Sequence, residues 1–311
     1  MQQSQPRYQS GITAAASPHA LFISYRALDA LEQSQLEALK AVLREIPAKQ
    51  QHYAQQQAAA QLHIVAALGS ELWDQLSPEA KPRDLTPFKA LVAGELAMPA
   101  TNADLLLHIR SERHDLNYKL ACELHAALSD ILTLDDSVHG FRYLDSRDLT
   151  GFVDGTENPQ DTHREEVAVV SDDAPFNGGS YIHTQKYRHN LEAWNAQSVK
   201  SQEDSYGRTK EENIEYAGAD KHASAHTKRT SLKDAAGNSI EILRHSLPYG
   251  DLHDSGLMFA SYCGNGDNFD SMLESMVTGL ESGQADSILT YTQALSGDAY
   301  FAPSIDWLEQ L

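Results

Sequence analysis

The segment from residue 151 to residue 159 presents a carboxylate in a setting that could serve chemistry. It reads G-F-V-D-G-T-E-N-P, so Asp154 lies between Gly151 and Gly155 on a short loop. Glycine adopts backbone angles closed to other residues and lets a ligand approach the main chain, so this carboxylate could project into a cavity. Asp-Gly is also a frequent dipeptide of hairpin turns. From this pair alone, a simple turn is the favoured interpretation.

A histidine and an arginine follow this carboxylate along the chain. His226 lies in the basic string S-A-H-T-K-R, and Arg244 ends the apolar run I-E-I-L-R. In this order and with these strings, the chain resembles the dye-decolourising peroxidase family, whose signature G-x-x-D-G precedes a haem-ligating histidine and a distal arginine. Further matching strings are Y-G-R-T-K at 206–210, L-M-F-A-S-Y at 257–262 and Y-F-A-P-S at 300–304. The resemblance covers nearly the whole chain and points to the short bacterial, class B-like branch.

The resemblance implies a role for each of these residues. His226 would bind the haem iron as its axial ligand, because an imidazole donates electron density to an iron that reacts with peroxide. Asp286 would accept the other ring N–H of this histidine and fix its tautomer. Asp154 would carry the proton that peroxide loses and regains. Arg244 would stabilise the negative charge that builds on the departing oxygen.

The resemblance also implies further contacts with the cofactor. Arg208 would neutralise a haem propionate. The residues after Asp154 would line the cofactor with main-chain groups, or their side chains would only fix the loop; they are Gly155, Thr156, Glu157 and Asn158. The chain contains no C-x-x-C-H string for thioether attachment, so we expect one non-covalent haem b per chain. Ser246 departs from the pattern, since several relatives carry an amide side chain there, and properties tuned by that amide are not carried over.

The expected activity is that of a peroxidase that reduces hydrogen peroxide and oxidises bulky organic reductants, such as dyes and phenols, in one-electron steps. A haem-binding or haem-iron-handling protein with incidental peroxidase activity is the alternative. Asp154 and Arg244 favour the enzyme, because a carrier needs no groups that assist O–O cleavage. A haem-free α+β interaction protein would lack a Soret band.

A zinc site is a further alternative. His222 and His226 have the spacing H-x-x-x-H, which can chelate zinc from one face of a helix. However, Ala223 occupies the place where the metalloprotease motif requires a glutamate.

The composition restricts the partners. The 311 residues include 24 Lys and Arg against 44 Asp and Glu, for a net charge of −20, which would repel nucleic acids and anionic membranes. There is no apolar run of about 18 residues, and the first twenty residues do not resemble a signal peptide. We therefore expect a cytoplasmic protein with no nucleic-acid or membrane partner. The two cysteines, Cys122 and Cys263, are expected to be buried free thiols.

Hydrophobic patterning predicts an α+β chain with an N-terminal half, 1–150, and a C-terminal half, 151–311. In the N-terminal half, strands are expected at 20–25, 62–68, 105–109 and 138–144. Two helices lie between them, the first ending at Pro47 and the second carrying apolar residues from Leu116 to Ile131. The resulting order β-α-β-β-α-β is typical of a ferredoxin-like unit.

The C-terminal half shows a less regular version of the same pattern. Strands are expected at 179–184, 240–243 and 257–262, and helices at 191–196 and along the apolar stripe from Phe269 to Leu280. The charged segment 198–221 is expected to be largely solvated loop. The family resemblance implies two ferredoxin-like halves packed sheet to sheet in a dimeric α+β barrel-like arrangement. The haem would lie in the C-terminal half, under the loop that starts at Gly151.

Two expectations concern reductants and assembly. Bulky reductants could deliver electrons through surface aromatic residues, and Trp194 and Tyr187, near the basic Lys186 and Arg188, are the candidates that could attract anionic dyes. The resemblance implies a homodimer or a larger homo-oligomer. Because no Gly/Ser-rich docking tail follows residues 307–311, packaging inside an encapsulating shell is not expected.

Overall fold

The computed structural model describes residues 6–311, so the first five residues of the predicted N-terminal half lie outside the described part. The elements of the first half are β1 (His19–Arg26), α1 (Gln33–Gln56), β2 (His63–Gly69), α2 (Ser70–Leu76), β3 (Leu91–Ala93), β4 (Leu96–Met98), β5 (Leu105–Ser111), α3 (His114–Leu128) and β6 (Thr133–Phe141). The main elements thus follow the predicted sequence of strands and helices. The strand expected at 138–144 begins earlier, at Thr133, and ends at Phe141.

The second half contains more short elements than its apolar pattern suggests. They are α4 (His163–Ala168), β7 (Ser180–His189), α5 (Leu191–Asn195), α6 (Val199–Tyr206), α7 (His226–Thr230), β8 (Leu243–Arg244), β9 (Leu247–Gly250), β10 (Ser255–Cys263), α8 (Asp267–Thr278), β11 (Thr292–Ala294), β12 (Asp298–Ala302) and α9 (Ile305–Gln310). None of the helices within residues 6–311 combines the length and apolar character needed to cross a membrane.

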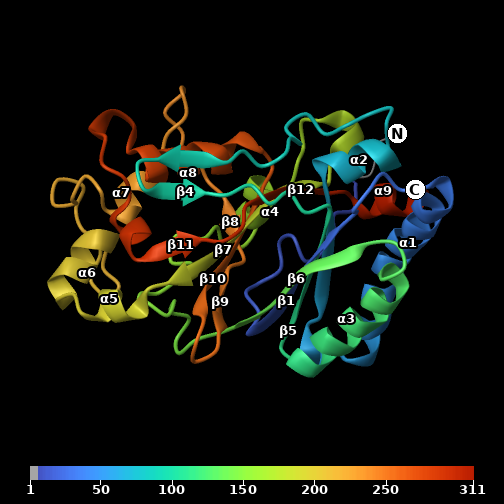
Figure 1. Ribbon diagram of the computed structural model, residues 1–311, viewed down its shortest axis with the longest axis horizontal. Helices are drawn as coiled ribbons and strands as arrows, with labels where there is room; N and C mark the ends of the chain where they lie inside the picture. Colours follow the sequence, from blue (N-terminus) through green and yellow to red (C-terminus); the bar gives the residue numbers. More distant parts are fainter. Residues whose placement is uncertain (1–5) are drawn as a thin grey trace.

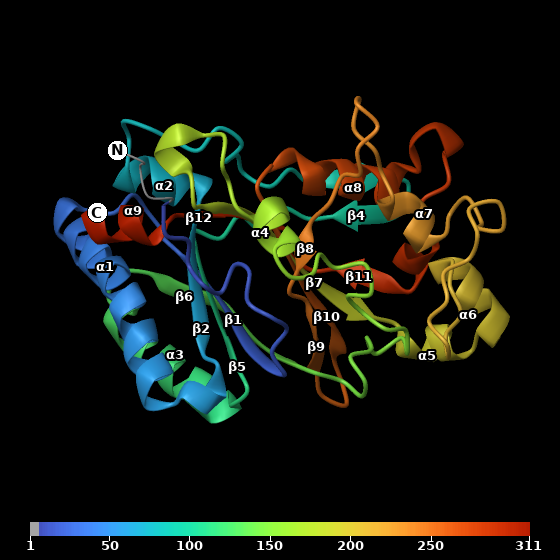
Figure 2. The same ribbon diagram turned by 180° about the vertical axis from the view of Figure 1, so that it is seen from behind.

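One ten-stranded sheet joins the two halves, in the order β11-β7-β12-β2-β5-β1-β6-β9-β10-β8. An additional pairing between β7 and β10 closes this sheet on itself. The helices α1 and α3 cover the sheet at one end of the molecule, and α5, α6, α7 and α8 lie at the opposite end (Figures 1 and 2). The prediction of a mixed α and β fold is confirmed, with the two groups of strands joined edge to edge.

Both faces of the central strands are buried, which explains their nearly continuous apolar sequences. In β1, Leu21, Ile23 and Tyr25 belong to a core cluster that also contains residues of α1 and α3. Ala20 and Phe22 alternate with them and belong to a second cluster, to which both halves of the chain contribute. Other members of this second cluster are Val65, Leu106, Val138, Ile182, Ala260 and Tyr262.

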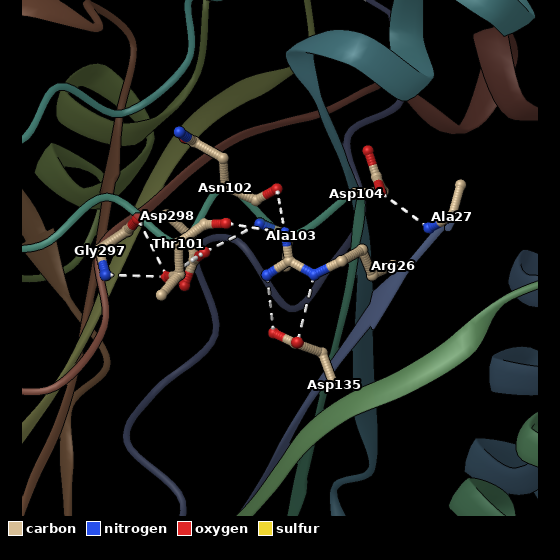
Figure 3. A network of polar contacts seen from close by, with 9 residues as sticks. All are labelled: Arg26, Ala27, Thr101, Asn102, Ala103, Asp104, Asp135, Gly297 and Asp298. Carbon is tan, nitrogen blue, oxygen red and sulfur yellow. Dashed lines mark hydrogen bonds and ion pairs between the residues drawn. The ribbon is translucent and has the colours of Figure 1, made fainter. Parts of the chain in front are cut away.

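A polar network also connects the halves (Figure 3). The Arg26 guanidinium donates to both carboxylate oxygens of Asp135 at 3.3 Å and to the Thr101 carbonyl at 2.9 Å. The Thr101 hydroxyl in turn donates to Asp298 at 2.7 Å. Burial raises the pKa of the Asp298 carboxyl. Because Thr101 and Asp298 are far apart in the sequence, this network holds β12 against the N-terminal half.

The prediction that Pro47 ends the first helix is wrong. The helix α1 continues to Gln56, with Pro47 inside it, although an internal proline costs roughly 3 kcal/mol. Leu39, Leu43 and Ile46 are buried before the proline, and Tyr53 extends the same face beyond it. Burial of this face offsets the local cost, as is usual for helices whose stability comes from tertiary packing.

Three other expectations are corrected. The segment 198–221 is not all loop, because α6 forms within it; Ser198 caps this helix, and Gln202 and Ser205 are buried on it. Cys122 is exposed on α3, and of the two cysteines only Cys263 is buried. The apolar stripe ends before Leu280, which is exposed, because Gly279 adopts a left-handed conformation at φ +71° and ends α8 at Thr278.

Candidate active site

The C-terminal half contains a cavity of about 390 Å³. Part of its apolar wall comes from β10 and α8, through Leu257, Phe259, Met272, Leu273 and Met276. The main polar side chains at the cavity come from separate segments and are Asp154, Arg208, His226 and Arg244. An apolar cavity with a few convergent polar groups is the usual form of a site for a small molecule or cofactor.

His226 is the first residue of α7, and its side chain lines this cavity. Its Nδ1 atom lies 2.6 Å from the Oδ2 atom of Asp286, whose side chain is 0 % exposed. The other carboxylate oxygen of Asp286 accepts the backbone N–H of Ile288 at 3.0 Å. With Nδ1–H donating to this fixed carboxylate, Nε2 carries the lone pair and can ligate a metal. Asp286 itself lies behind His226, outside the cavity lining.

Asp154 and Arg244 line the same cavity as His226. The Arg244 Nη1 atom lies 3.6 Å from the Asp154 Oδ1 atom, and the two side chains are 25 % and 24 % exposed. The two side chains form an ion pair, but the distance between these atoms is too long for a hydrogen bond. Both groups therefore retain free donor or acceptor positions with which to act on a ligand.

Asn158 explains how the loop holds this pair. Its side-chain amide accepts the backbone N–H of Arg244 at 2.9 Å and donates to the Arg244 carbonyl at 2.8 Å. Asp154 is held from the other side, because its backbone N–H donates to the Ser146 carbonyl at 2.9 Å. Gly151 and Gly155 adopt φ angles of +87° and +81°, which favour glycine. Asn158 and Gly155 contact a neighbouring cavity instead of the main one, so Asn158 acts here by fixing the loop.

Asn158→Ala removes both hydrogen bonds to the main chain of Arg244. We expect the free energy of unfolding to fall by about 1–3 kcal/mol, since partly buried groups of Arg244 lose their partners. The free energy is measured by urea denaturation. Asn195→Ala, at the exposed end of α5, serves as the control and should change it little. Equal stability of the two variants would show that the Asn158 bonds do not hold the loop.

Arg208, Glu157 and Thr156 also line the cavity. The Arg208 side chain is buried, and its Nε atom has no hydrogen-bond partner within residues 6–311. One of its terminal nitrogens lies 3.5 Å from the exposed carboxylate of Glu157. Thr156 accepts a hydrogen bond from Asn213 at 2.8 Å, which ties the Gly151 loop to the segment after Arg208. Arg208 is thus a cation at the cavity wall with unused donor capacity.

The structure adds a buried polar chain that the sequence analysis missed. The Asp148 carboxylate contacts His189 Nε2 at 3.2 Å and accepts the Thr150 hydroxyl at 2.7 Å, and that hydroxyl lies 2.7 Å from the Tyr206 hydroxyl. Burial alone would raise the pKa of the Asp148 carboxyl, but the hydrogen bonds and charge of His189, together with the Thr150 bonds, lower it. Burial raises the pKa of Tyr206, and the Asp148 charge adds to this effect. The Tyr206 ring lies 6.0 Å from the ring of His226.

Trp194 and Tyr187 were expected to be surface aromatic residues that pass electrons from bulky reductants. The expectation that they lie at the surface is wrong, because both are buried. Trp194 is 1 % exposed and Tyr187 is also buried. The indole N–H of Trp194 donates to the Thr150 carbonyl at 2.9 Å, and its ring packs edge-on against Tyr206 and Tyr291 at 5.8 and 5.2 Å. Tyr206 and Tyr291 are partly exposed, whereas Trp194 is not. Dyes therefore cannot contact Trp194 directly.

The helical zinc pair does not form. The helix α7 begins at His226, so His222 precedes it and does not share its face. The Nδ1 atom of His222 instead lies 2.7 Å from the Ser224 hydroxyl. Ser246 lines both cavities, and its hydroxyl accepts the backbone N–H of Ala260 at 3.2 Å.

Comparison with known protein families gives matches along nearly the whole chain. Residues 9–142 match the family model described as Dyp-type peroxidase, N-terminal, and residues 145–307 match the model described as Dyp-type peroxidase, C-terminal. A dye-decolorizing peroxidase from Mycolicibacterium paratuberculosis is 36 % identical over 301 residues, which cover 96 % of this chain and 84 % of that protein.

Solved structures with the same fold include two informative relatives. A putative Dyp-type peroxidase from Shewanella oneidensis is 42 % identical, with a TM-score of 0.94 and coverage of 99 % of both chains. A variant of DypB from Rhodococcus jostii RHA1, solved in complex with heme, is 35 % identical, with a TM-score of 0.94 and coverage of 99 % of both chains.

Proposed function

Since the chain belongs to the Dyp-type peroxidase family, we propose that its main cavity holds one non-covalent haem b, with His226 as the axial ligand of the iron. The protein is a haem peroxidase of the dye-decolourising type, and hydrogen peroxide and organic reductants are its substrates. The observation that carries the assignment of the site is the His226–Asp286 pair at the wall of an apolar cavity.

Several features of the cavity support its fit to a haem. The apolar side chains of β10 and α8 suit the faces of a porphyrin, and the Nε2 atom of His226 is free to bind iron. Arg208 offers a cation with an unpartnered Nε atom, which suits a propionate. Thr156 and Glu157 line the cavity beside it.

Haem, when bound, supplies the iron at which peroxide is reduced and reductants are oxidised. Asp154 accepts the proton that peroxide loses and returns it to the departing oxygen. The Arg244 guanidinium, which stays protonated, stabilises the negative charge on that oxygen. Asp286 holds the Nδ1 proton of His226, which fixes the tautomer and raises the basicity of the ligand. The alternative of a haem-handling protein gives no reason for the paired Asp154 and Arg244.

Reconstitution with haem tests this proposal. The protein is loaded with haem, freed of excess by gel filtration, and its haem content is measured. We expect one haem per chain, a Soret band typical of histidine ligation, and complete extraction of the haem into acidified butanone. Haem that stayed with the protein after extraction, or a content far from one, would contradict a single non-covalent site.

We further propose that the halves 1–150 and 151–311 are two ferredoxin-like units. The antiparallel strand orders β2-β5-β1-β6 and β12-β7-β10-β9 support this proposal. When the short strands β3, β4, β8 and β11 are set aside, the four remaining strands of each half have the same order in the sheet. A homodimer or larger homo-oligomer and a cytoplasmic location also stay proposals. Free cysteines agree with a reducing compartment.

Trp194 remains a candidate for electron transfer, now as a buried relay. Its ring lies between Tyr206, which is next to His226, and the partly exposed Tyr291. We expect Trp194→Phe to slow the oxidation of bulky dyes severalfold and to leave the reaction with peroxide unchanged. Steady-state dye turnover and stopped-flow absorbance measure the two effects. Trp307→Phe, a replacement of the ring stacked on Trp73, is the control. Unchanged dye turnover in Trp194→Phe would rule out this route.

A further inference from the structure

A second cavity, of about 260 Å³, adjoins the main one. Asp154, Arg244 and Ser246 line both cavities. The remaining wall of the second cavity comes from β1 and the segment before it, from β5, from α4 and the segment between β6 and α4, and from β8 and β9. It therefore lies between the two halves of the chain, next to the groups that we assign to the reaction with peroxide.

The lining of this cavity is strongly basic, although the chain carries a net charge of −20. Asp154 is the one carboxylate among its described lining residues, against five arginines: Arg110, Arg142, Arg147, Arg164 and Arg244. Arg147 is paired with Asp145 at 2.8 Å, and Arg244 with Asp154 at 3.6 Å. Within residues 6–311, no carboxylate lies within 4.0 Å of the other three guanidinium groups. The cavity thus holds an excess of positive charge.

Arg110 is the most unusual of these residues, because its side chain is only 3 % exposed. It donates to His245 Nδ1 at 2.7 Å and to the carbonyls of Gly11 and Ala14, and its Nε atom has no partner within the described residues. Burial lowers the pKa of Arg110 to about 10, and the charge of Arg164 adds to this effect. A buried charge without a counter-charge is costly, so this site calls for an anion.

Two neighbours strengthen the case. His108, which is 1 % exposed, lines the cavity, and its Nε2 atom has no partner within residues 6–311. Arg164, on α4, is half-buried, and among the described residues its guanidinium donates only to the Pro159 carbonyl and the Gln160 side chain. Arg110 and Arg164 line the same cavity, and the charge of Arg164 contributes to the lowered pKa of Arg110. A shared anion would relieve the repulsion between the two charges.

We propose that this cavity binds a small planar oxyanion, a carboxylate or an inorganic anion of similar shape, between Arg110 and Arg164. Within residues 6–311, the Arg110 Nε atom and the Arg164 Nη1 atom have no hydrogen-bond partner, so the two residues together could donate to two oxygens of one anion. The volume of about 260 Å³ is ample for an anion of a few atoms. The anion is separate from the haem propionates, for which Arg208 is the cation at the main cavity.

Calorimetric titration of the haem-loaded protein with sodium nitrate, at constant ionic strength in a buffer free of other small anions, tests the proposal. Absorbance spectra are recorded over the same concentrations. We expect saturable binding of one nitrate per chain with an unchanged Soret band. Arg164→Gln should weaken binding by about tenfold or more, because a charge-assisted contact is lost. Arg113→Gln, which removes an exposed arginine paired with Asp115, should bind as the unmodified protein does.

Four results would overturn the proposal. The absence of saturable heat would show that no site exists, and a Soret shift with the same midpoint would place nitrate on the iron. Binding to the haem-free protein alone would show that a propionate fills this cavity. Equal affinity in Arg164→Gln and the unmodified protein would likewise contradict the site. A failure of the protein to load haem would instead contradict the proposed haem site at His226. The two failures are distinguishable, because the titration measures the heat of anion binding and not the haem content.

Discussion

Replacement of His226 by alanine is expected to leave the protein with little or no haem. We propose His226 as the only protein bond to the iron, and the chain has no C-x-x-C-H string that would tether the porphyrin. The substitution also leaves Asp286, whose side chain is fully buried, without its imidazole partner. The haem content after purification or reconstitution is measured from the Soret band and by the pyridine haemochrome method.

His222→Ala is the matched control for this experiment. It removes a histidine four residues earlier whose ring contacts Ser224, so it should bind haem in full. Retention of a normal histidine-ligated spectrum in His226→Ala would rule out His226 as the ligand. Loss of haem from both variants would indicate that the segment around α7, and not one imidazole, holds the cofactor.

Arg244→Leu is expected to slow the reaction with peroxide by roughly 10²–10³-fold, the usual effect of removing one preorganised group that stabilises transition-state charge. The Arg244 side chain lines the cavity beside Asp154, and leucine offers no charge to the departing oxygen. The second-order rate constant for the haem absorbance change is measured by stopped flow. Haem content should remain near that of the unmodified protein, because Arg244 is not the ligand.

Arg113→Leu provides the control for charge, since Arg113 is exposed, forms an ion pair with the neighbouring Asp115 and does not line either cavity. Its rate constant should equal that of the unmodified protein. If Arg244→Leu reacted at this same rate, the guanidinium would have no role in cleaving the O–O bond.

Local pattern was sufficient to predict the elements with strong periodicity. The strands near β1, β2, β5, β7 and β10 and the helices α3 and α8 are present because their apolar residues recur with the period of the element they form. The prediction that the helix ends at Pro47 failed because it gave the proline more weight than Tyr53, which is buried on the same face of the helix after Pro47. The helix α6 was missed because Gln202 and Ser205 are buried although they are polar.

In the candidate site, too, some residues could be predicted from local sequence and others depend on tertiary contacts. Asp154, His226 and Arg244 stand in short recognisable strings, so their joint position at one cavity could be expected from the family resemblance. Fixing the loop was one of the two roles expected for Asn158, but its partner, the main chain of Arg244, could not be identified from the sequence. The Asp148–Thr150–Tyr206 chain depends on contacts between distant segments. Burial of Trp194 likewise depends on tertiary packing, which its basic neighbours in sequence do not reveal.

The rate of reaction with peroxide in Asp154→Asn, compared with Arg244→Leu and the unmodified protein between pH 5 and pH 8, tests the central claim most directly. All three proteins are loaded with haem and mixed with hydrogen peroxide in a stopped-flow spectrometer. We predict that both variants react more slowly than the unmodified protein throughout this range, since one lacks the proton acceptor and the other the stabilising charge. If both reacted at the unmodified rate at every pH, the proposed distal mechanism would be refuted, and a haem-handling protein with incidental peroxidase activity would become the better account.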